Sequence, residues 1–331
     1  MLYYNVGVII MQTYKQVRNA MLAMQRHSWE QGFAAQALLE AGETELFVAM
    51  AHDAVVRQWQ DGRLAMMGGE TAITDSGANG EAVWRAFEIT ENEIFKTAAE
   101  KMLEYVMIYA PHTEDGVIYH NEKSFDKGFT PNQIWADSCY MGPPFMAVMN
   151  ELNEATKQLF GIMNYLRDDD SGCMFHKFDA GSQKFVRREL WATGTGWLLL
   201  GTAKLVYEAK YIGDITAYET LTQTGQEVLD CMLKYQRDDG LFHDILNKPD
   251  TFTDGTSAMM MAAFIYRGLK EGWLAGRNYK QHADRVRKTM VKNIDEFGII
   301  HGVCGAPLFD RQGTSPEAQA AWLTMENWAK K

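Results

Sequence analysis

The sequence predicts an all-α fold, an (α/α)6 toroid in which six helical hairpins surround one core. Two observations lead to it: a local pattern that returns about every 57 residues, and an alternation of strongly apolar helices with amphipathic ones. The chain of 331 residues holds about six such units, which is the number that closes a ring. We therefore expect a single domain over residues 1–331. A linear α-solenoid is the competing architecture.

The first landmark of the repeat is a turn in which an acidic or polar residue leads to a glycine and then to a short apolar segment. These glycines are 54, 56, 68 and 58 residues apart, and four of the turns continue to a histidine. Such a period is typical of a repeated supersecondary unit. The glycines are Gly62, Gly116, Gly172, Gly240 and Gly298, and the histidines are His120, His176, His243 and His301.

The second landmark is a cluster of Ser, Thr, Asp and Gly that opens a strongly apolar helix. Six such clusters occur, at residues 27–32, 74–80, 135–137, 191–197, 253–257 and 314–317. Between them lie amphipathic segments with charged outer faces, at residues 45–59, 93–109, 218–235 and 279–294. This patterning is typical of surface helices, so inner and outer helices should alternate along the chain. Strand signal is almost absent.

Within the third unit, residues 130–145 place an acidic residue at the mouth of a buried helix. Asp137 and Ser138 are good helix-start residues, and Pro143 and Pro144 suit a first turn, where their missing amides cost no helical hydrogen bond. The following residues are almost all apolar, so we expect the helix to be buried, with Asp137 at its only accessible end. A plain N-cap role for Asp137 is the alternative.

Composition and charge exclude several classes of protein. A net charge of −11 without clustered Lys and Arg argues against a nucleic-acid partner. No segment approaches the roughly 18 consecutive apolar residues that span a bilayer, and the apolar start at residues 2–11 lacks the basic flank and cleavage site of a signal peptide. We expect a cytoplasmic protein that is not membrane-embedded. The sequence does not define an oligomeric state.

The cysteines point to neither a metal site nor a disulfide framework. The four residues lie far apart without a C-x-x-C pair, which fits a reducing compartment. No metal or organic cofactor is implied. The cysteines are Cys139, Cys173, Cys231 and Cys304.

In the toroid all inner helices begin at the same end, and helix N-termini attract anions. A substrate that carries a carboxylate is therefore expected there. The residues collected at that end are Trp29, Asp75, Asp137, His176, Trp191, Trp197 and Thr256.

Seven motifs spread over nearly the whole chain resemble landmarks of the unsaturated uronyl hydrolases, glycoside hydrolase family 105 and its relative family 88, in the family's order. They are Trp29-Glu-Gln-Gly32, Thr74-Asp-Ser-Gly-Ala-Asn-Gly-Glu81, Asn132-Gln-Ile-Trp-Ala-Asp137 with Tyr140-Met-Gly-Pro-Pro-Phe145, Trp191-x-x-Gly-x-Gly-Trp197, Tyr235-Gln-x-Asp-Asp-Gly-Leu241, Thr256-Ser-Ala258 and Ser315-x-Glu-Ala-Gln319. The resemblance implies a six-hairpin toroid that hydrates the C4=C5 double bond of an unsaturated uronic acid on a small oligosaccharide.

The resemblance also implies roles for individual residues. Asp137 matches the general acid/base, and Asp75 matches a second aspartate that helps to hold the sugar and position the water. Trp29, Trp191 and Trp197 match sugar-stacking positions, and His176 matches a sugar-contacting histidine. For each of these residues a purely structural role is the alternative: an N-cap for Asp75, core packing for the tryptophans, and a turn contact for the histidine.

One position departs from the family pattern. The family has arginine two residues after the first tryptophan of the Trp191 motif, whereas this chain has Thr193. The pocket should therefore be less cationic, unless Arg187 or Arg188 substitutes; a solvated surface pair is the alternative for these two.

The sequence leaves the linked sugar open. A rhamnogalacturonan-type fragment from pectin degradation is the first expectation, and a glycosaminoglycan-type fragment is the alternative. Three other functions compete with hydration: a sugar 2-epimerase that uses the turn histidines, an ordinary hydrolase that uses Asp75 and Asp137 as a carboxylate pair, and a binding module without catalysis.

Overall fold

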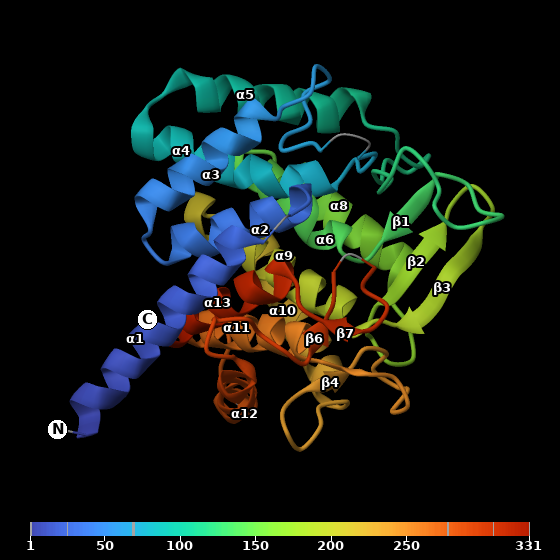
Figure 1. Cartoon of the computed structure of the whole chain (residues 1–331). Helices are drawn as coiled ribbons and strands as arrows, with labels where there is room; N and C mark the ends of the chain where they lie inside the picture. The colour runs from blue at the N-terminus through green and yellow to red at the C-terminus, as the bar shows by residue number, and fades with distance from the viewer. Residues whose placement is uncertain (1, 25, 68–69, 277, 307, 331) are drawn as a thin grey trace.

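The computed structural model describes residues 2–24, 26–67, 70–276, 278–306 and 308–330. Inner and outer helices alternate through these residues (Figure 1). The inner helices are α2 (Ser28–Glu40), α4 (Ala78–Thr90), α6 (Ser138–Met141) with α7 (Pro143–Val148), α9 (Ala192–Ile212), α11 (Gly255–Glu271) and α13 (Pro316–Lys330). The outer helices are α1 (Leu2–Ala23), α3 (Thr44–Val56), α5 (Glu93–Glu104), α8 (Leu152–Leu166), α10 (Ile215–Leu233) and α12 (Tyr279–Met290).

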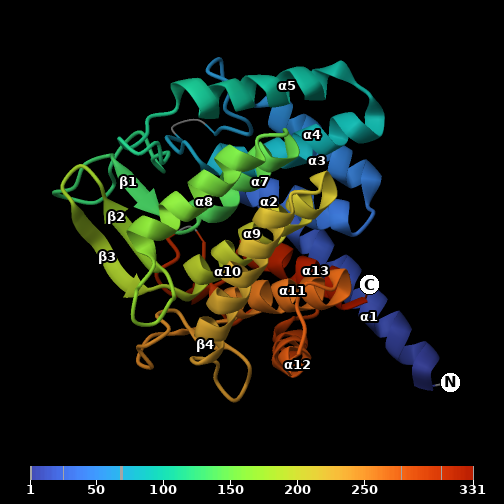
Figure 2. The same cartoon turned by 180° about the vertical axis from the view of Figure 1, so that it is seen from behind.

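The inner helices form a closed ring. Each packs on the next in chain order, and the last, α13, packs on the first, α2. The two views in Figures 1 and 2 show the outer helices arranged around this ring. In an open solenoid the first and last repeats would not touch, so the toroid is confirmed and the solenoid is wrong.

Burial separates the two sets of helices as the patterning predicts. Every residue of α11 from Gly255 to Gly268 is buried. In the outer helix α12 the buried residues are Tyr279, Ala283, Val286 and Met290, which recur every three or four positions and form one stripe. An inner helix is surrounded by protein, whereas an outer helix needs only one apolar face.

The five repeat glycines adopt the backbone that their turns require. All have φ between 80° and 105°, a region that L side chains rarely adopt. In four of the turns the glycine amide donates to the carbonyl three residues earlier, as Gly116 does to Thr113. Space is also limiting: a Cβ on Gly298 would lie 2.3 Å from the backbone carbon of Gln16 in α1. These turns therefore end one unit and start the return toward the next inner helix.

Three small antiparallel sheets lie around the end of the barrel where the inner helices begin, and the three-stranded one is on the right in Figure 1. These sheets are small, and the fold is mostly helical, as predicted. Most of these strands have two or three residues, too few for an alternating pattern to be visible. The sheets are β1 (Gln133–Trp135), β2 (Phe175–Asp179) and β3 (Lys184–Leu190); β4 (Phe242–His243) with β5 (Thr253–Asp254); and β6 (Val303–Cys304) with β7 (Gln312–Gly313).

The third inner element also differs from the expectation of one continuous helix. Asp137 precedes the short helix α6, the chain breaks at Gly142, and a second helix, α7, begins at Pro143. The prolines do occupy a first turn, but it is the first turn of α7. This break leaves Asp137 between β1 and a short helix.

Cys173 and Cys231 form a disulfide, with their Cα atoms 6.0 Å apart. The expectation of a chain without disulfides is wrong. The two residues are 58 positions apart, about one repeat, and neighbouring repeats lie side by side in the ring, so positions one period apart can meet. Cys139 and Cys304 are free and buried.

Removing this disulfide should lower the free energy of unfolding by about 2–4 kcal/mol, because the cross-link closes a long loop and restricts the unfolded chain. Guanidinium unfolding of the double variant Cys173→Ser/Cys231→Ser, compared with the oxidised wild type, measures the difference. Wild-type protein treated with a reductant should match the variant. Equal stability of the oxidised and reduced wild type would contradict the pairing.

None of the helices within the described residues is both long and apolar enough to cross a bilayer.

Candidate active site

A cavity of about 650 Å³ opens at the end of the barrel where the inner helices begin. Its wall contains all seven of the site residues that the sequence predicts: Trp29, Asp75, Asp137, His176, Trp191, Thr193 and Trp197. They come from four inner-helix starts and from β2, so only the closed ring brings them together.

Asp137 lies in the cavity wall between β1 and α6. Its side chain is 15% exposed. It makes no cap hydrogen bond to α6, and its Oδ1 atom has no hydrogen-bond partner. An N-cap aspartate would accept a hydrogen bond from the first turn of its helix. The structure therefore does not support a plain N-cap role for Asp137, whose Oδ1 is a buried oxygen that the protein leaves unpaired.

Asp75 is the second carboxyl group in the wall, at the start of the 3-10 turn Asp75–Gly77 that precedes α4. It is buried, makes no cap hydrogen bond, and its Oδ1 atom also lacks a partner. His120 lies between the two aspartates: its Nε2 is 3.7 Å from Asp75 Oδ1 and its Nδ1 is 3.8 Å from Asp137 Oδ1. The His120 Nδ1 is held at 2.8 Å from the Thr74 hydroxyl and 3.1 Å from that of Ser138.

The environment of the two aspartates favours their protonated forms. Burial raises the pKa of Asp137 to about 6, although the nearby Lys177 ammonium acts in the opposite direction. Burial and then repulsion by Asp137 raise the pKa of Asp75 well above its ordinary value. Burial holds the pKa of His120 well below its usual range, so this ring is neutral. The aspartate pair can therefore retain a proton near neutral pH, as a general acid requires.

Stacked pairs of histidine and tryptophan form much of the remaining wall. Trp191 stacks on His176 with ring centroids 4.0 Å apart, and Trp135 stacks on His120 at 4.1 Å. The Trp135 ring also meets His176 edge to face, so these four rings are continuous. The pairs hold the imidazoles in fixed orientations against the cavity.

Trp197 takes a different position from the other predicted stacking residues. Its side chain borders the cavity but is only 1% exposed. Its ring packs against Phe33 at 4.9 Å and Tyr140 at 4.8 Å. Trp197 therefore belongs mainly to the core at the cavity floor, which was the structural alternative for this residue.

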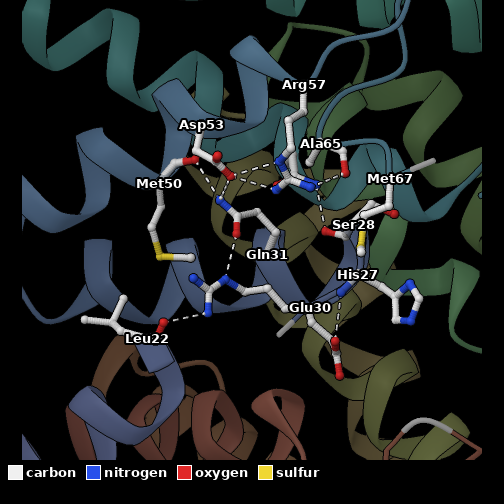
Figure 3. Close-up of polar contacts among 12 residues, drawn as sticks. Leu22, His27, Ser28, Glu30, Gln31, Met50, Asp53, Arg57, Ala65 and Met67 are labelled. Carbon is white, nitrogen blue, oxygen red and sulfur yellow. Dashed lines mark hydrogen bonds and ion pairs between the residues drawn. The ribbon is translucent and has the colours of Figure 1, made fainter. Parts of the chain in front are cut away.

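The start of α2, which carries Trp29, is held by a polar network (Figure 3). Gln31 donates to the Met50 carbonyl at 2.9 Å and to Asp53 at 3.1 Å, and Arg57 pairs with the same aspartate at 2.7 Å. These contacts tie α2 to the outer helix α3. The position of Trp29 at the cavity mouth is therefore set by the packing of the hairpin.

Carboxyl groups gather around Trp29. Its Nε1 donates to Glu317 of α13 at 3.1 Å, and the neighbouring Ser28 hydroxyl donates to Glu70. Burial raises the pKa of Glu30 to about 7 and raises that of Glu317 well above its ordinary value. We call Glu70 and Glu317, which line the cavity, its acidic side.

Thr193 does not present a free side chain to the cavity. Its hydroxyl donates to Asp254 at 2.7 Å. The buried Asp254 carboxylate also accepts from the amides of Thr256, Ser257 and Cys304. Position 193 thus contributes no cation, as the sequence predicts.

Among the residues that line the cavity are two cations: Arg187, one of the two arginines that could substitute for the missing one, and Lys177, which no sequence motif indicates. Lys177 on β2 and Arg187 on β3 both line the cavity and are directly paired across the two strands. Arg188 instead lies over the rings of Phe175 and Phe185. The sequence indicates the position of Arg187 only weakly. Neighbouring side chains of a strand point to opposite faces, so Arg187 and Arg188 can be told apart only once residues 184–190 are known to form a strand.

The model of Glycosyl Hydrolase Family 88 matches residues 5–313. The chain belongs to this family. It is therefore a glycosidase.

Relatives of this family 88 chain are distant in sequence and close in fold. The unsaturated rhamnogalacturonyl hydrolase YesR of Bacillus subtilis is 22% identical over 277 residues, which cover 80% of this chain and 74% of YesR. The crystal structure of a possible member of the GH105 family from Salmonella enterica has a TM-score of 0.81 at 17% identity and covers 96% of this chain and 92% of its own. An unsaturated glucuronyl hydrolase specific for heparin has a TM-score of 0.72 at 15% identity, with 97% and 95% covered.

The four turn histidines of this family 88 chain divide into two groups. His120 and His176 line the cavity. His243 instead bonds the Arg237 guanidinium at 2.8 Å and the Thr251 carbonyl, and His301 pairs with Asp295 at 2.9 Å within its own turn. The repeat therefore places histidines at equivalent turns, but only two of them reach the site.

One set of side chains in this family 88 chain has the composition of a metal site. Asp75, His120 and Asp137 each offer one ligand atom, and these atoms lie within 4.8 Å of one another. The same three groups form the acidic centre described above. The absence of a metal cofactor stays a prediction.

Proposed function

We propose that this glycosidase adds water across the C4=C5 double bond of an unsaturated uronic acid at the non-reducing end of a small oligosaccharide. Such substrates are left by polysaccharide lyases. The proposal assigns Asp137 as the general acid and base and Asp75 as the residue that positions the sugar and the water. It treats residues 1–331 as one catalytic domain that works without an organic cofactor.

The proposed reaction begins with transfer of a proton from Asp137 to C4. The resulting cation at C5 is stabilised by the ring oxygen and is captured by water, which returns a proton to the Asp137 carboxylate. The product is a hemiketal at C5. Breaking its bond between C5 and the ring oxygen gives a C5 ketone and a hemiacetal at C1, which then expels the neighbouring sugar as an alcohol. The glycosidic bond thus breaks after the enzymatic step.

One observation carries this assignment: Asp137 is a buried carboxyl group in the cavity wall that caps no helix and has its pKa raised to about 6. Retaining a proton near neutral pH suits the protonation of an enol ether. Burial of a carboxyl group without a hydrogen-bond partner for Oδ1 costs stability, and such a cost is typical of a functional position.

The epimerase alternative is less well supported. It requires histidines that exchange protons, whereas burial lowers the pKa of both His120 and His176 well below the usual range. Both rings are also fixed by stacking on tryptophans. A binding module without catalysis would need no buried acid pair.

An ordinary two-carboxylate hydrolase remains the nearer rival. An inverting enzyme holds its carboxyl groups about 6.5–9.5 Å apart to admit a water between them. Here the nearest oxygens of Asp75 and Asp137 lie within 4.8 Å, which leaves no such room. A retaining hydrolase would release the sugar with the C4=C5 bond intact, so deuterium labelling at C4 distinguishes it from hydration.

For the linked sugar we propose a rhamnogalacturonan-type fragment. The relative YesR is an unsaturated rhamnogalacturonyl hydrolase. The acidic side of the cavity also disfavours a sulfated neighbour, because the Glu70 carboxylate would repel a sulfate group. The similarity in fold to an unsaturated glucuronyl hydrolase specific for heparin leaves a glycosaminoglycan-type fragment as the alternative. Pectin degradation and a cytoplasmic location stay predictions.

The test is loss of the ultraviolet absorbance of the enol carboxylate when the protein is mixed with unsaturated disaccharides. We expect turnover of a rhamnogalacturonan disaccharide, and slower turnover of a sulfated glycosaminoglycan disaccharide. The unsulfated form of the latter is the matched control, and it should be turned over faster than its sulfated counterpart. Stable absorbance with every unsaturated uronate would overturn the proposed function.

A further inference from the structure

The two cations of the cavity lie on one structural element, the β2–β3 hairpin. Lys177 and Arg187 are register partners in these antiparallel strands, so their side chains leave the same face of the sheet. Among the residues that line the cavity they are the lysine and the arginine, whereas Glu70 and Glu317 form its acidic side. The cationic groups of the cavity thus come from the hairpin, and its carboxyl groups come from other elements.

Neither cation is fully neutralised by the protein. The Arg187 side chain is 42% exposed, and its Nε lies 4.0 Å from Glu189, at the outer limit of an ion pair. The Lys177 ammonium is 3.8 Å from Asp126 and 3.5 Å from the centroid of the Trp135 ring. Since Lys177 is only 11% exposed, it is fixed in place and poorly hydrated, which strengthens its attraction for an anion.

The opposite situation holds at position 193. Thr193 is neutral, and its hydroxyl is already bonded to the buried Asp254 carboxylate. An anionic substrate group near it would meet a like charge without a compensating cation. The carboxylate of a substrate should thus turn toward the hairpin.

We propose that Lys177 and Arg187 bind the carboxylate of the unsaturated uronate and so take the place of the arginine that position 193 lacks. This inference rests on the proposed function and adds the residues that select an acidic substrate. The forked guanidinium suits a carboxylate, and the ammonium supplies a second charge-assisted contact.

The experiment compares an unsaturated disaccharide with its uronate methyl ester, which has the same double bond but no charge. Wild type should prefer the free acid in kcat/KM. Arg187→Gln and Lys177→Gln should each lower the ratio of acid to ester by about 10- to 100-fold, mostly through KM for the acid. Arg187→Lys should restore part of the ratio, because it keeps the charge without the fork.

Arg188→Gln is the matched control, since its side chain lies over Phe175 and Phe185. It should leave the ratio unchanged. Arg187 is partly exposed, so its replacement should not affect folding, and thermal melts verify this for both glutamine variants. A wild type without preference for the acid, or glutamine variants that keep the wild-type ratio, would overturn the inference while leaving the proposed function intact. Failure of wild type to consume either compound would overturn the proposed function itself.

Discussion

The variant Asp137→Asn should lose activity by at least about 10²–10⁴-fold in kcat, because an amide cannot deliver the proton to C4 or accept one from water. Asparagine has nearly the same shape as aspartate. Because Asp137 caps no helix, the change should leave the fold intact and should relieve the cost of a buried carboxyl group. Steady-state turnover of an unsaturated disaccharide and thermal unfolding of the same preparation measure both effects.

Asp214 offers a matched control, because it is a true N-cap. Its side chain accepts a hydrogen bond from the Ala217 amide at the start of α10. Asp214→Asn should leave both activity and the unfolding temperature nearly unchanged, since asparagine caps as well as aspartate. Substantial turnover by Asp137→Asn would remove Asp137 from the mechanism.

Replacing the second carboxyl group, in Asp75→Asn, should lower kcat/KM by about 10²-fold and leave its alkaline limb in place. Burial and repulsion by Asp137 raise the pKa of Asp75 well above its ordinary value, so Asp75 still carries its proton when Asp137 ionises. Burial raises the pKa of Asp137 to about 6, and a neutral asparagine in place of a neutral carboxyl group should not change it. The loss should therefore come from the holding of the sugar and the water.

The measurement is kcat/KM against pH, which reports the groups of the free enzyme. Both profiles should fall as the pH rises through about 6, the pKa of Asp137, and the Asp75→Asn profile should be lower throughout. An alkaline limb that moves to lower pH in Asp75→Asn would mean that Asp75 is already ionised when Asp137 loses its proton.

The parts of the fold that repeat could be predicted from the sequence. Periodicity identifies the alternation of helices, and the five turn glycines mark the units because each adopts a left-handed backbone. Motif order then places Asp75 and Asp137 at the same end of the barrel. These features are local or recur in several repeats, so the sequence alone is enough to identify them.

The features that escaped prediction each depend on contacts between distant segments. The Cys173–Cys231 disulfide forms only when two repeats lie side by side, and the spacing of the cysteines in the sequence does not indicate it. Lys177 reaches the cavity because β2 pairs with β1 and β3, and strands as short as these carry little pattern. Trp197 shares a motif with Trp191, yet the orientation of its helix turns it into the core.

His120 could not be assigned to the site from the sequence either. Its turn is equivalent to those of His243 and His301, and nothing local distinguishes the three. Only the fold places His120 between Asp75 and Asp137. Whether a turn histidine lies in the site therefore depends on where the closed ring places its turn, and not on its position within the repeat.

The central claim is that the enzyme protonates C4 of a double bond and does not cleave the glycosidic bond directly. Following the reaction by NMR in deuterium oxide tests it. We expect one deuteron at C4, delivered to a single face, to appear at the same rate as the released sugar, with loss of the vinyl hydrogen signal at C4. Release of the sugar while the first-formed uronate keeps its C4 vinyl signal would contradict the account and assign Asp75 and Asp137 to ordinary glycoside hydrolysis.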